Sequence, residues 1–238
     1  MKVKIYKLNS FAKTLRGGNP AGVVLNADGL AEKEMLAVAK KAGFSETAFV
    51  QKSNKEDFKV RFFTSTNEVD LCGHATIAVY FLMYQKALIK AGKYKQETKA
   101  GILGIEVLPD GTIYMNQKSP EFFEEVDKNE IADLLNISID KFIPDLPAQI
   151  VSTGLKDVIV PVKSFKDLLS IEPNFEAVSN ASKRLGVVGW HVFTFETKFN
   201  AAAHCRDFAP LYGVPEESAT GTSTGALACY LFKHGRLK

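Results

Sequence analysis

The chain has 238 residues, and its 46% hydrophobic and 24% charged residues are the usual balance of a globular protein in water. The net charge of +3 is small and the lysines are scattered, which argues against a nucleic-acid-binding protein. The run of residues 71–85 without Asp, Glu, Lys or Arg, which no other such run exceeds, is shorter than the roughly 20 residues that cross a membrane. We therefore expect neither nucleic acid nor a membrane as a partner.

The cysteine pattern and the absence of cofactor-binding motifs argue against disulfides, metals and nucleotide cofactors. Cys72, Cys205 and Cys229 are an odd number without metal-type spacing, and no signal peptide is found, so we expect free thiols in the cytoplasm. His-Glu-x-x-His, Cys-x-x-Cys and Asp-rich loops do not occur in the sequence, and neither do the glycine-rich loops that bind nucleotides. The sequence therefore predicts no metal and no cofactor.

Strand and helix patterns mix along the chain with short connections, which predicts an α+β protein. The N-terminal residues alternate between polar and apolar types as in a strand, Gly43 supplies the left-handed stop of a helix, and Pro109-Asp110-Gly111 marks a hairpin. The patterns predict helices at 31–42, 129–136 and 175–185, and strands at 47–51, 58–63, 104–108, 112–117, 149–151, 158–162 and 187–195.

Two further segments, 75–84 and 225–232, carry no charge on any side. A helix that is apolar all round is a buried helix, so we expect each segment to be surrounded by other structure. Each follows a glycine-bearing turn, which is Cys72-Gly73-His74 in the first case and Thr220-Gly221-Thr222 in the second.

These two regions also resemble each other in sequence. The matching residues are Gly73, Thr76 and Ala78 with Gly221, Thr224 and Ala226, and, further upstream, Arg61-Phe62-Phe63 with Arg206-Asp207-Phe208. We infer an ancient duplication with two similar halves, residues 1–117 and 118–238, each with strands around a central helix. So short a similarity could also arise by chance.

The two helix starts predict a binding site. Helix N-termini carry unpaired N–H groups and the positive end of the helix dipole, and glycine lets a ligand approach the backbone closely. If the halves face each other across a cleft, both turns can hold a carboxylate there. The alternative is that Gly73 and Gly221 only cap their helices.

Glu46 is the candidate for proton transfer. It lies between a helix end and an apolar strand, where partial burial would raise its pKa from about 4.3 towards neutrality, so that it can take and give a proton. The alternative is a surface glutamate that caps a turn. His74 could hold a substrate carboxylate, donate a proton or cap its helix, whereas His191 is expected to be packed in a strand.

A cysteine nucleophile is a third possibility. Cys72 is two positions from His74, but side chains with this spacing in a tight turn seldom point at each other, and no third orienting group is evident. We therefore do not expect covalent catalysis by Cys72.

A series of short motifs runs through the chain from the first strand to the last residue. They are Gly-Gly-Asn-Pro-Ala-Gly-Val-Val-Leu at 17–25, and then 45–50, 61–64, 68–76, 152–155, 206–210 and 219–222. In this order they resemble the PhzF family of phenazine-biosynthesis-like proteins. The family's fold is similar to that of diaminopimelate epimerase, which implies two pseudo-symmetric halves, each a mixed sheet or barrel wrapped around a central apolar helix.

The resemblance also implies a function. Family members are typically homodimers without a cofactor, and in the phenazine enzyme the glutamate of the Ser-Glu motif shuttles a proton during isomerisation of a dihydro-hydroxyanthranilate. The resemblance assigns that role to Glu46. It assigns substrate binding to Asn19, Gly73, His74, Glu217, Gly221 and Thr222. We expect an isomerase that shifts a proton on a small carboxylate-bearing metabolite.

Three departures from the family pattern bear on this expectation. Glu217 and Ser218 replace an Asp-Pro pair, which lengthens one binding group and loosens its loop. Cys72 has the place of the first cysteine of two-thiol epimerases, but Thr220 has the second, so racemisation by two thiols is not expected. Relatives continue past His234-Gly235, so the second half is expected to be truncated. A non-catalytic ligand-binding protein on the same scaffold therefore remains the alternative.

Overall fold

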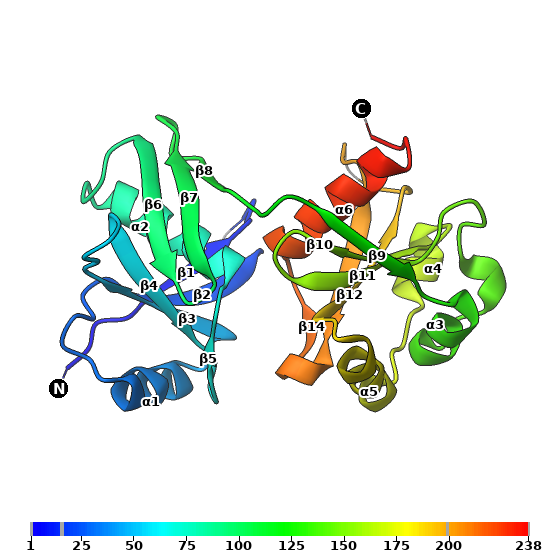
Figure 1. Cartoon of the computed structure of the whole chain (residues 1–238), viewed down its shortest axis with the longest axis horizontal. Helices are drawn as coiled ribbons and strands as arrows, with labels where there is room; N and C mark the ends of the chain where they lie inside the picture. The colour runs from blue at the N-terminus through cyan, green and yellow to red at the C-terminus, as the bar shows by residue number, and fades with distance from the viewer. Residues whose placement is uncertain (1, 15–16, 199, 238) are drawn as a thin grey trace. The chain divides into compact units, whose positions relative to one another are not determined.

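Two compact units make up the chain, Met1–Asn116 and Gln117–Lys238, in a computed structural model that describes residues 2–14, 17–198 and 200–237 (Figure 1). Each unit has its own sheet, helices and core. Among the helices that the structure describes, none combines the length and the apolar character needed to cross a membrane.

The first unit is built on an eight-stranded sheet with the order β1-β2-β3-β4-β6-β7-β8, in which β5 pairs with β4. Neighbouring strands are antiparallel except for the parallel pairs β2–β3 and β4–β6. The elements are β1 (Tyr6–Ser10), β2 (Asn19–Val24), α1 (Glu32–Ala42), β3 (Glu46–Gln51), β4 (Phe58–Phe63), β5 (Glu68–Val69), α2 (Gly73–Gln85), β6 (Gly92–Thr98), β7 (Gly101–Val107) and β8 (Ile113–Met115).

The apolar helix α2 packs on one face of this sheet, where it contacts β1, β2, β3, β7 and β8. It contains no Asp, Glu, Lys or Arg, and most of its residues are buried, among them His74, Tyr80 and Met83. On the opposite face, α1 packs Met35 and Ala39 against side chains of β3 and β4. Because α2 is held against five strands, the position of its first turn at one end of the sheet is fixed.

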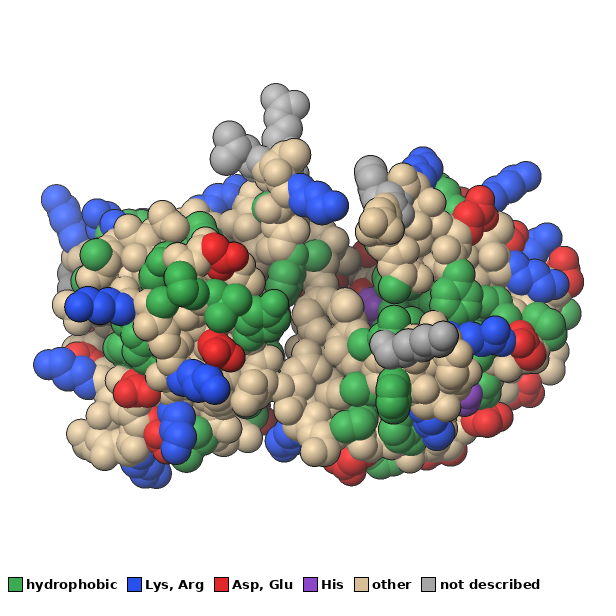
Figure 2. Space-filling model, turned by 90° about the horizontal axis from the view of Figure 1, so that it is seen from above, with side chains coloured by type: hydrophobic (Ala, Val, Ile, Leu, Met, Phe, Trp, Pro, Cys, Tyr) green, Lys and Arg blue, Asp and Glu red, His purple; other side chains and the backbone are tan. Residues whose placement is uncertain are grey.

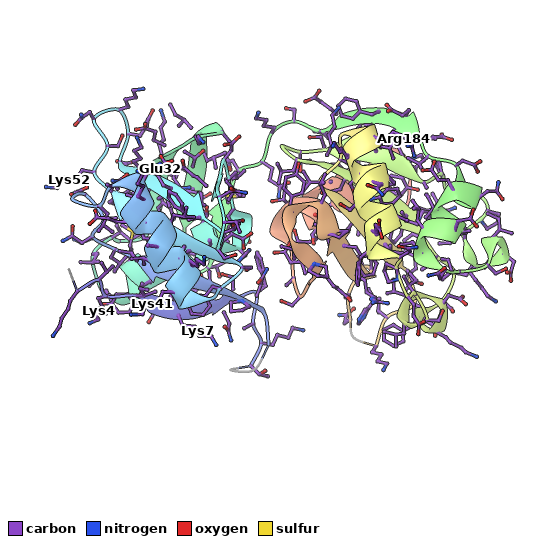
Figure 3. All side chains as sticks on the ribbon, turned by 90° about the horizontal axis from the view of Figure 1, so that it is seen from below. Lys4, Lys7, Glu32, Lys41, Lys52 and Arg184 are labelled. Carbon is purple, nitrogen blue, oxygen red and sulfur yellow. The ribbon has the colours of Figure 1, made fainter. Side chains whose placement is uncertain are left out.

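The local sequence explains both ends of α1. At its start, the Glu34 carboxylate accepts a hydrogen bond of 2.8 Å from the backbone N–H of Ala31. Figure 3 shows Glu32 at this end and Lys41 at the other, the arrangement that the helix dipole favours. Gly43 ends the helix with φ 71°, a left-handed conformation in which glycine lacks the Cβ clash of other residues. The predicted helix stop is confirmed.

The second unit contains a six-stranded sheet with the order β14-β13-β12-β11-β10-β9. Neighbouring strands are antiparallel except for the parallel pair β11–β12. The elements are β9 (Glu121–Glu125), α3 (Lys128–Leu135), η1 (Ile139–Lys141), β10 (Gln149–Ser152), β11 (Lys156–Pro161), α4 (Phe165–Leu169), α5 (Phe175–Leu185), β12 (Gly189–Thr194), β13 (His204–Ala209), η2 (Pro210–Tyr212), β14 (Val214–Glu217) and α6 (Gly221–Lys233).

The helices of the second unit cover both faces of its sheet. On one face α6 packs Ala226, Leu227 and Tyr230 against β10, β11 and β12. On the other face α3, α4 and α5 enclose a larger core that contains the fully buried Trp190. The second sheet is therefore a central layer, with the apolar helix α6 on one side and three amphipathic or short helices on the other.

The expectation that both apolar helices are buried on every side is wrong in part. Phe81 of α2 is 41% exposed, and Phe232 near the end of α6 is 69% exposed. Each helix packs firmly on its own sheet, but the side that faces away from the sheet retains exposed apolar side chains. From the lack of charged residues we predicted correctly that each helix packs against other structure. We overestimated how much of each helix surface is buried.

The two units repeat one order of elements. The series β1, β2, α1, β3, β4, β5, α2 corresponds to β10, β11, α4 with α5, β12, β13, β14, α6, with the same parallel and antiparallel pairings. A hydrogen bond at the helix start also recurs. The Ser10 hydroxyl donates to the His74 carbonyl at 2.6 Å, and the Thr153 hydroxyl donates to the Thr222 carbonyl at 3.4 Å. The predicted α+β fold with two pseudo-symmetric halves is confirmed.

Charged side chains of both signs are mixed on the surface. Figure 2 shows Lys and Arg interspersed with Asp and Glu on the visible face of each unit. Such mixing gives no extended field of one sign on that face, in keeping with the small net charge of the sequence.

We predict that Ser182→Ala destabilises the second unit. The Ser182 hydroxyl of α5 accepts a 2.8 Å hydrogen bond from the indole N–H of Trp190 and donates to the Val178 carbonyl. Its removal leaves the buried indole N–H unsatisfied, at a cost of about 1–3 kcal/mol of unfolding free energy. Urea unfolding followed by Trp190 fluorescence measures this, because the sequence contains one tryptophan. Ser179→Ala on the same helix is the control, and equal effects of both substitutions would contradict the prediction.

Candidate active site

Several strand ends meet at one end of the sheet in the first unit. β1 ends at Ser10, which pairs with Asn19 at the start of β2, and the parallel strand β3 begins at Glu46, opposite Ala21. The hydrogen bond from Ser10 to the carbonyl of His74 shows that α2 begins at the same end. The structure therefore places the predicted residues Asn19, Glu46 and His74 at one end of one unit.

The first turn of α2 presents backbone donors to an anion. The N-cap residue is Cys72, and this turn, all of which the structure describes, holds no acidic residue that would compete for the positive helix end. The Thr76 hydroxyl donates a 2.8 Å hydrogen bond to the Cys72 carbonyl and so fixes the turn. Gly73 adds no side chain that would block access to these N–H groups, so the turn can bind a carboxylate.

Glu46, Cys72 and His74 form one contact cluster at this helix start. Glu46 Oε2 lies 3.4 Å from His74 Nε2, and Cys72 Sγ lies 3.4 Å from His74 Nδ1. The Cys72 thiol also forms a hydrogen bond with the Glu46 carboxyl group. The side chain of Glu46 is 14% exposed and that of His74 is 4% exposed, so water has little access to either group.

Burial moves the carboxyl and the imidazole towards their neutral forms. Desolvation raises the pKa of Glu46, while the nearby side chains of Ser45 and Cys72 favour the ionised form and limit the rise. Desolvation also lowers the pKa of His74 to about 4, against a hydrogen bond from its ring to the Pro20 carbonyl. His74 is therefore neutral at pH 7, and its contact with Glu46 is not an ion pair at that pH.

The expectation that Cys72 and His74 do not point at each other is wrong. Cys72 has the extended backbone of an N-cap (φ −142°, ψ 114°) whereas His74 is already helical, and this change of conformation brings the two side chains together. The cluster also brings together oxygen, nitrogen and sulfur donors within 4.8 Å of one another, a set that could hold a metal ion. The sequence motifs had predicted no such site.

The other predicted residues lie in the second unit. Glu217 is half-buried at the end of β14, and Gly221 and Thr222 begin α6. The side-chain amide of Gln117 donates a 2.9 Å hydrogen bond to the Gly221 carbonyl. This first turn also contains no acidic residue, so it is built like the turn of the first unit. That the two turns share one cleft stays a prediction.

A buried polar cluster beneath the start of α6 was missed by the sequence reasoning. It consists of Asp157 on β11, His191 on β12 and Asp207 on β13, each no more than 4% exposed. His191 Nδ1 lies 3.0 Å from Asp207 Oδ1, and the Ser223 hydroxyl of α6 forms a hydrogen bond with Asp157. His191 is packed, as expected, but it is also paired with a carboxylate.

Burial and the neighbouring groups of the cluster shift the pKa values of Asp157 and His191. Burial and the charge of Asp207 raise the pKa of Asp157 to about 7, while His191 and Ser223 act in the opposite direction. Burial by itself would lower the pKa of His191, but hydrogen bonds with Asp207 and Cys205 raise it to about 10. At neutral pH the cluster therefore contains a protonated His191 beside Asp207, and Asp157 titrates next to them.

The first unit has apolar residues where the second has this cluster. When β2, β3 and β4 are aligned with β11, β12 and β13 by their strand pairings, residues of one sheet have equivalents in the other. The equivalents of Asp157, His191 and Asp207 in the first unit are Ala21, Ala48 and Phe62.

The same registers match Glu46 with Gly189, the first residue of β12. A Cβ atom on Gly189 would lie 2.6 Å from Asp157 Oδ1, closer than such contacts occur in proteins. The second unit therefore cannot place an acidic side chain at the position of Glu46 while the cluster is present. The available sequence signal for the cluster was an aspartate, Asp157, inside the otherwise apolar segment 156–161.

Comparisons with known proteins point to one family. The model of the PhzC-PhzF family, described as phenazine biosynthesis-like protein, matches residues 8–238. An uncharacterized isomerase of Clostridium acetobutylicum is 38% identical over 98% of this chain and 80% of its own length. A trans-2,3-dihydro-3-hydroxyanthranilate isomerase of Pseudomonas fluorescens is 29% identical over 97% of this chain and 80% of its own length.

Solved structures agree with this match. The crystal structure of a PhzF-family phenazine biosynthesis protein from Bacillus anthracis aligns with a TM-score of 0.90 and 35% identity, over 97% of this chain and 80% of that chain. A probable proline racemase from Agrobacterium radiobacter K84 aligns with a TM-score of 0.66 at 11% identity, over 100% of this chain and 79% of that chain, which shows a likeness of fold alone.

We predict that Asp157→Asn flattens the pH dependence of the stability of the second unit. With a folded-state pKa of about 7, Asp157 holds its proton more tightly in the folded chain than in the unfolded chain, where its pKa is about 3.9. The unfolding free energy therefore falls as the pH rises from about 4 to 7, by an amount on the order of 2–4 kcal/mol. Asparagine carries no titrating proton, so this fall should be lost in the variant.

The test is urea unfolding at several pH values between 4 and 7, followed by Trp190 fluorescence. Asp133→Asn, an exposed-helix substitution in the same unit, serves as the matched control. Equal pH slopes for the wild type and Asp157→Asn would show that Asp157 does not titrate in this window.

Proposed function

Because the chain belongs to the phenazine biosynthesis-like PhzC-PhzF family and is an isomerase of that family, we propose that it shifts a proton on a small carboxylate-bearing metabolite. In this proposal Glu46 removes a proton from an acidic C–H group of the substrate and returns it at another carbon. The chemistry uses one general base that becomes the general acid, and it uses no bound cofactor.

The observation that carries the proposal is the environment of Glu46. Its carboxyl group is nearly buried, its pKa is raised by desolvation, and it lies 3.4 Å from the ring of His74. A carboxyl group with a raised pKa is a stronger base than an exposed one and can still release its proton near neutral pH. An exposed glutamate that only capped a turn would have neither the burial nor this contact.

The first turn of α2 supports a role in anion binding. The N–H groups after Cys72 favour a carboxylate, and the neutral ring of His74 forms no ion pair with Glu46 that would weaken it as a base. Asn19, at the adjacent strand start, is buried and offers an amide for substrate orientation. We assign substrate binding in the first unit to Asn19, Gly73 and His74.

In the second unit the proposal assigns substrate contacts to Glu217, Gly221 and Thr222. The turn at the start of α6 repeats the backbone arrangement of the α2 turn, which supports a second point of contact for a polar or anionic group. Glu217 stands where family members usually have aspartate. The longer side chain changes where the carboxylate ends, and such changes alter which substrate a site accepts.

The proposal therefore stops at the class of substrate. The Pseudomonas fluorescens relative is named for the isomerisation of trans-2,3-dihydro-3-hydroxyanthranilate, and this compound is a rational first candidate for assay. Homodimer formation, which the family resemblance implies, stays a prediction that sedimentation analysis can test.

We predict that Glu46→Gln reduces turnover by about 10²–10⁴-fold, the usual contribution of a general acid–base group. Glutamine preserves the size of the side chain but cannot accept the proton. The assay is transfer of deuterium from solvent into candidate carboxylic acids, beginning with the substrate of the Pseudomonas relative, read by NMR. Glu124→Gln, at an exposed glutamate of β9, is the matched control.

Two outcomes of this assay would count against the proposal. Turnover that survives Glu46→Gln would remove Glu46 from its assigned role. Tight binding of an acid by the wild type, with neither deuterium uptake nor conversion of the acid to an isomer, would instead favour the non-catalytic alternative.

The pH profile gives an independent check. Glu46 must be ionised to take a proton, so kcat/KM should fall as the pH falls through its raised pKa, above the ordinary range of about 4.3. Cys72→Ala removes a hydrogen bond that favours the ionised form, so the acidic limb of the profile should move to higher pH. A complete loss of activity at every pH in Cys72→Ala, with the fold retained, would instead indicate a thiol-dependent enzyme.

A further inference from the structure

The cluster of Glu46, Cys72 and His74 has the composition of a metal site as well as that of a proton-transfer site. It offers one carboxylate oxygen, one thiol sulfur and one imidazole nitrogen, all within 4.8 Å of one another. Among the residues that the structure describes, this is the group of three potential ligands that comes close enough to share an ion. We propose that it binds a thiophilic divalent metal ion of the zinc type, and that the bound ion blocks the isomerase.

The distances in the cluster are close to those of a zinc site. Zinc binds sulfur at about 2.3 Å and nitrogen or oxygen at about 2.0–2.2 Å, so two ligands of a tetrahedral ion lie about 3.3–3.6 Å apart. Cys72 Sγ and His74 Nδ1 are 3.4 Å apart. The Glu46 carboxyl group already forms a hydrogen bond with Cys72. The three ligand atoms lie within 4.8 Å of one another, so a side-chain movement of about 1 Å would bring them to the spacing of a three-ligand zinc site.

The surroundings hold the two helix-borne ligands in place. Cys72 and His74 flank Gly73 at the start of α2, where the hydroxyl of Thr76 binds the carbonyl of Cys72 and that of Ser10 binds the carbonyl of His74. The ring of His74 also donates a hydrogen bond to the Pro20 carbonyl.

The chemical types of the three ligand atoms determine which metal ions the site prefers. A thiolate with an imidazole suits zinc, cobalt or cadmium, whereas magnesium and calcium prefer sites made of oxygen alone. On binding, the Cys72 thiol loses its proton to solvent and a sulfur–metal bond forms, with no change of oxidation state. Three protein ligands leave a fourth position for water or for a carboxylate of the substrate.

Occupation of the site and proton transfer exclude each other. When one oxygen of Glu46 coordinates the ion, the positive charge of the ion lowers the basicity of the whole carboxylate, so it no longer takes a proton from a C–H group. The inhibition therefore rests on the proposed function of Glu46, whereas the metal binding does not. This difference allows the two claims to be tested separately.

The first experiment measures binding without any substrate. Cobalt(II) is titrated into metal-free full-length protein, and the absorption spectrum is recorded. We expect a thiolate-to-cobalt charge-transfer band and visible bands of tetrahedral intensity, which saturate at one ion per chain and disappear when zinc is added. Absence of the charge-transfer band would overturn the proposal.

Variants identify the ligands. Cys72→Ser should abolish the charge-transfer band and weaken zinc binding at least about tenfold. Cys205→Ser and Cys229→Ser, which change the other two thiols, should leave both unchanged. Glu46→Gln should keep the thiolate band but weaken binding, and it provides a second test if Cys72→Ser fails to fold. A band that persists in folded Cys72→Ser would assign the metal to another site and contradict the proposal.

The second experiment measures inhibition. Zinc should suppress deuterium exchange by wild-type enzyme at least about tenfold, with the same concentration dependence as displacement of cobalt, and a chelator should restore it. Full exchange by zinc-saturated enzyme would overturn the inhibitory role. If metal-free enzyme exchanges no candidate acid, the proposed function fails, and the cobalt spectra still decide whether the metal site exists.

Discussion

The structure depends on the burial of two helices, α2 and α6, that together have only one charged side chain, Lys233 at the end of α6, with which to face water. Each helix packs against a sheet, and this packing fixes the position of the first helical turn. For α2 that turn lies at the end of the sheet where β3 begins, so the first residue of β3 is carried into an apolar setting. The basicity of Glu46 is therefore a consequence of helix packing, because desolvation by the surrounding core raises its pKa.

Features that depend on interactions between neighbouring residues, such as helix bounds and helix stops, could be predicted from the sequence. The helix at Phe175–Leu185 has the predicted bounds, and Gly43 ends α1 in the conformation that its position required. Side-chain contacts that depend on tertiary pairing were not accessible in the same way. His191 meets Asp207 because β12 and β13 pair in one register, and Cys72 meets His74 because the N-cap changes backbone direction. Neither fact leaves a periodic signal in the sequence.

The two units share the geometry of the helix start but differ in the residues buried beneath it. Both retain the helix start and the hydroxyl-to-carbonyl bond beneath it, which maintain the geometry of the turn. The layer under the helix has diverged, because it is apolar in the first unit and contains Asp157, His191 and Asp207 in the second. Ser223 connects α6 to this polar layer, so the second turn is anchored by a network whose charge depends on pH.

The glycine that occupies the place of Glu46 in the second unit has a stereochemical consequence. A side chain at Gly189 would clash with Asp157, because its Cβ would lie only 2.6 Å from Asp157 Oδ1, so the fold supplies a carboxyl group in only one of the two equivalent positions. An enzyme with a base in each half can remove a proton from one face of a carbon atom and deliver another to the opposite face. If Glu46 acts as we propose, its lone carboxyl group works from one side of the substrate, which corresponds to suprafacial migration of hydrogen and not to inversion of a stereocentre.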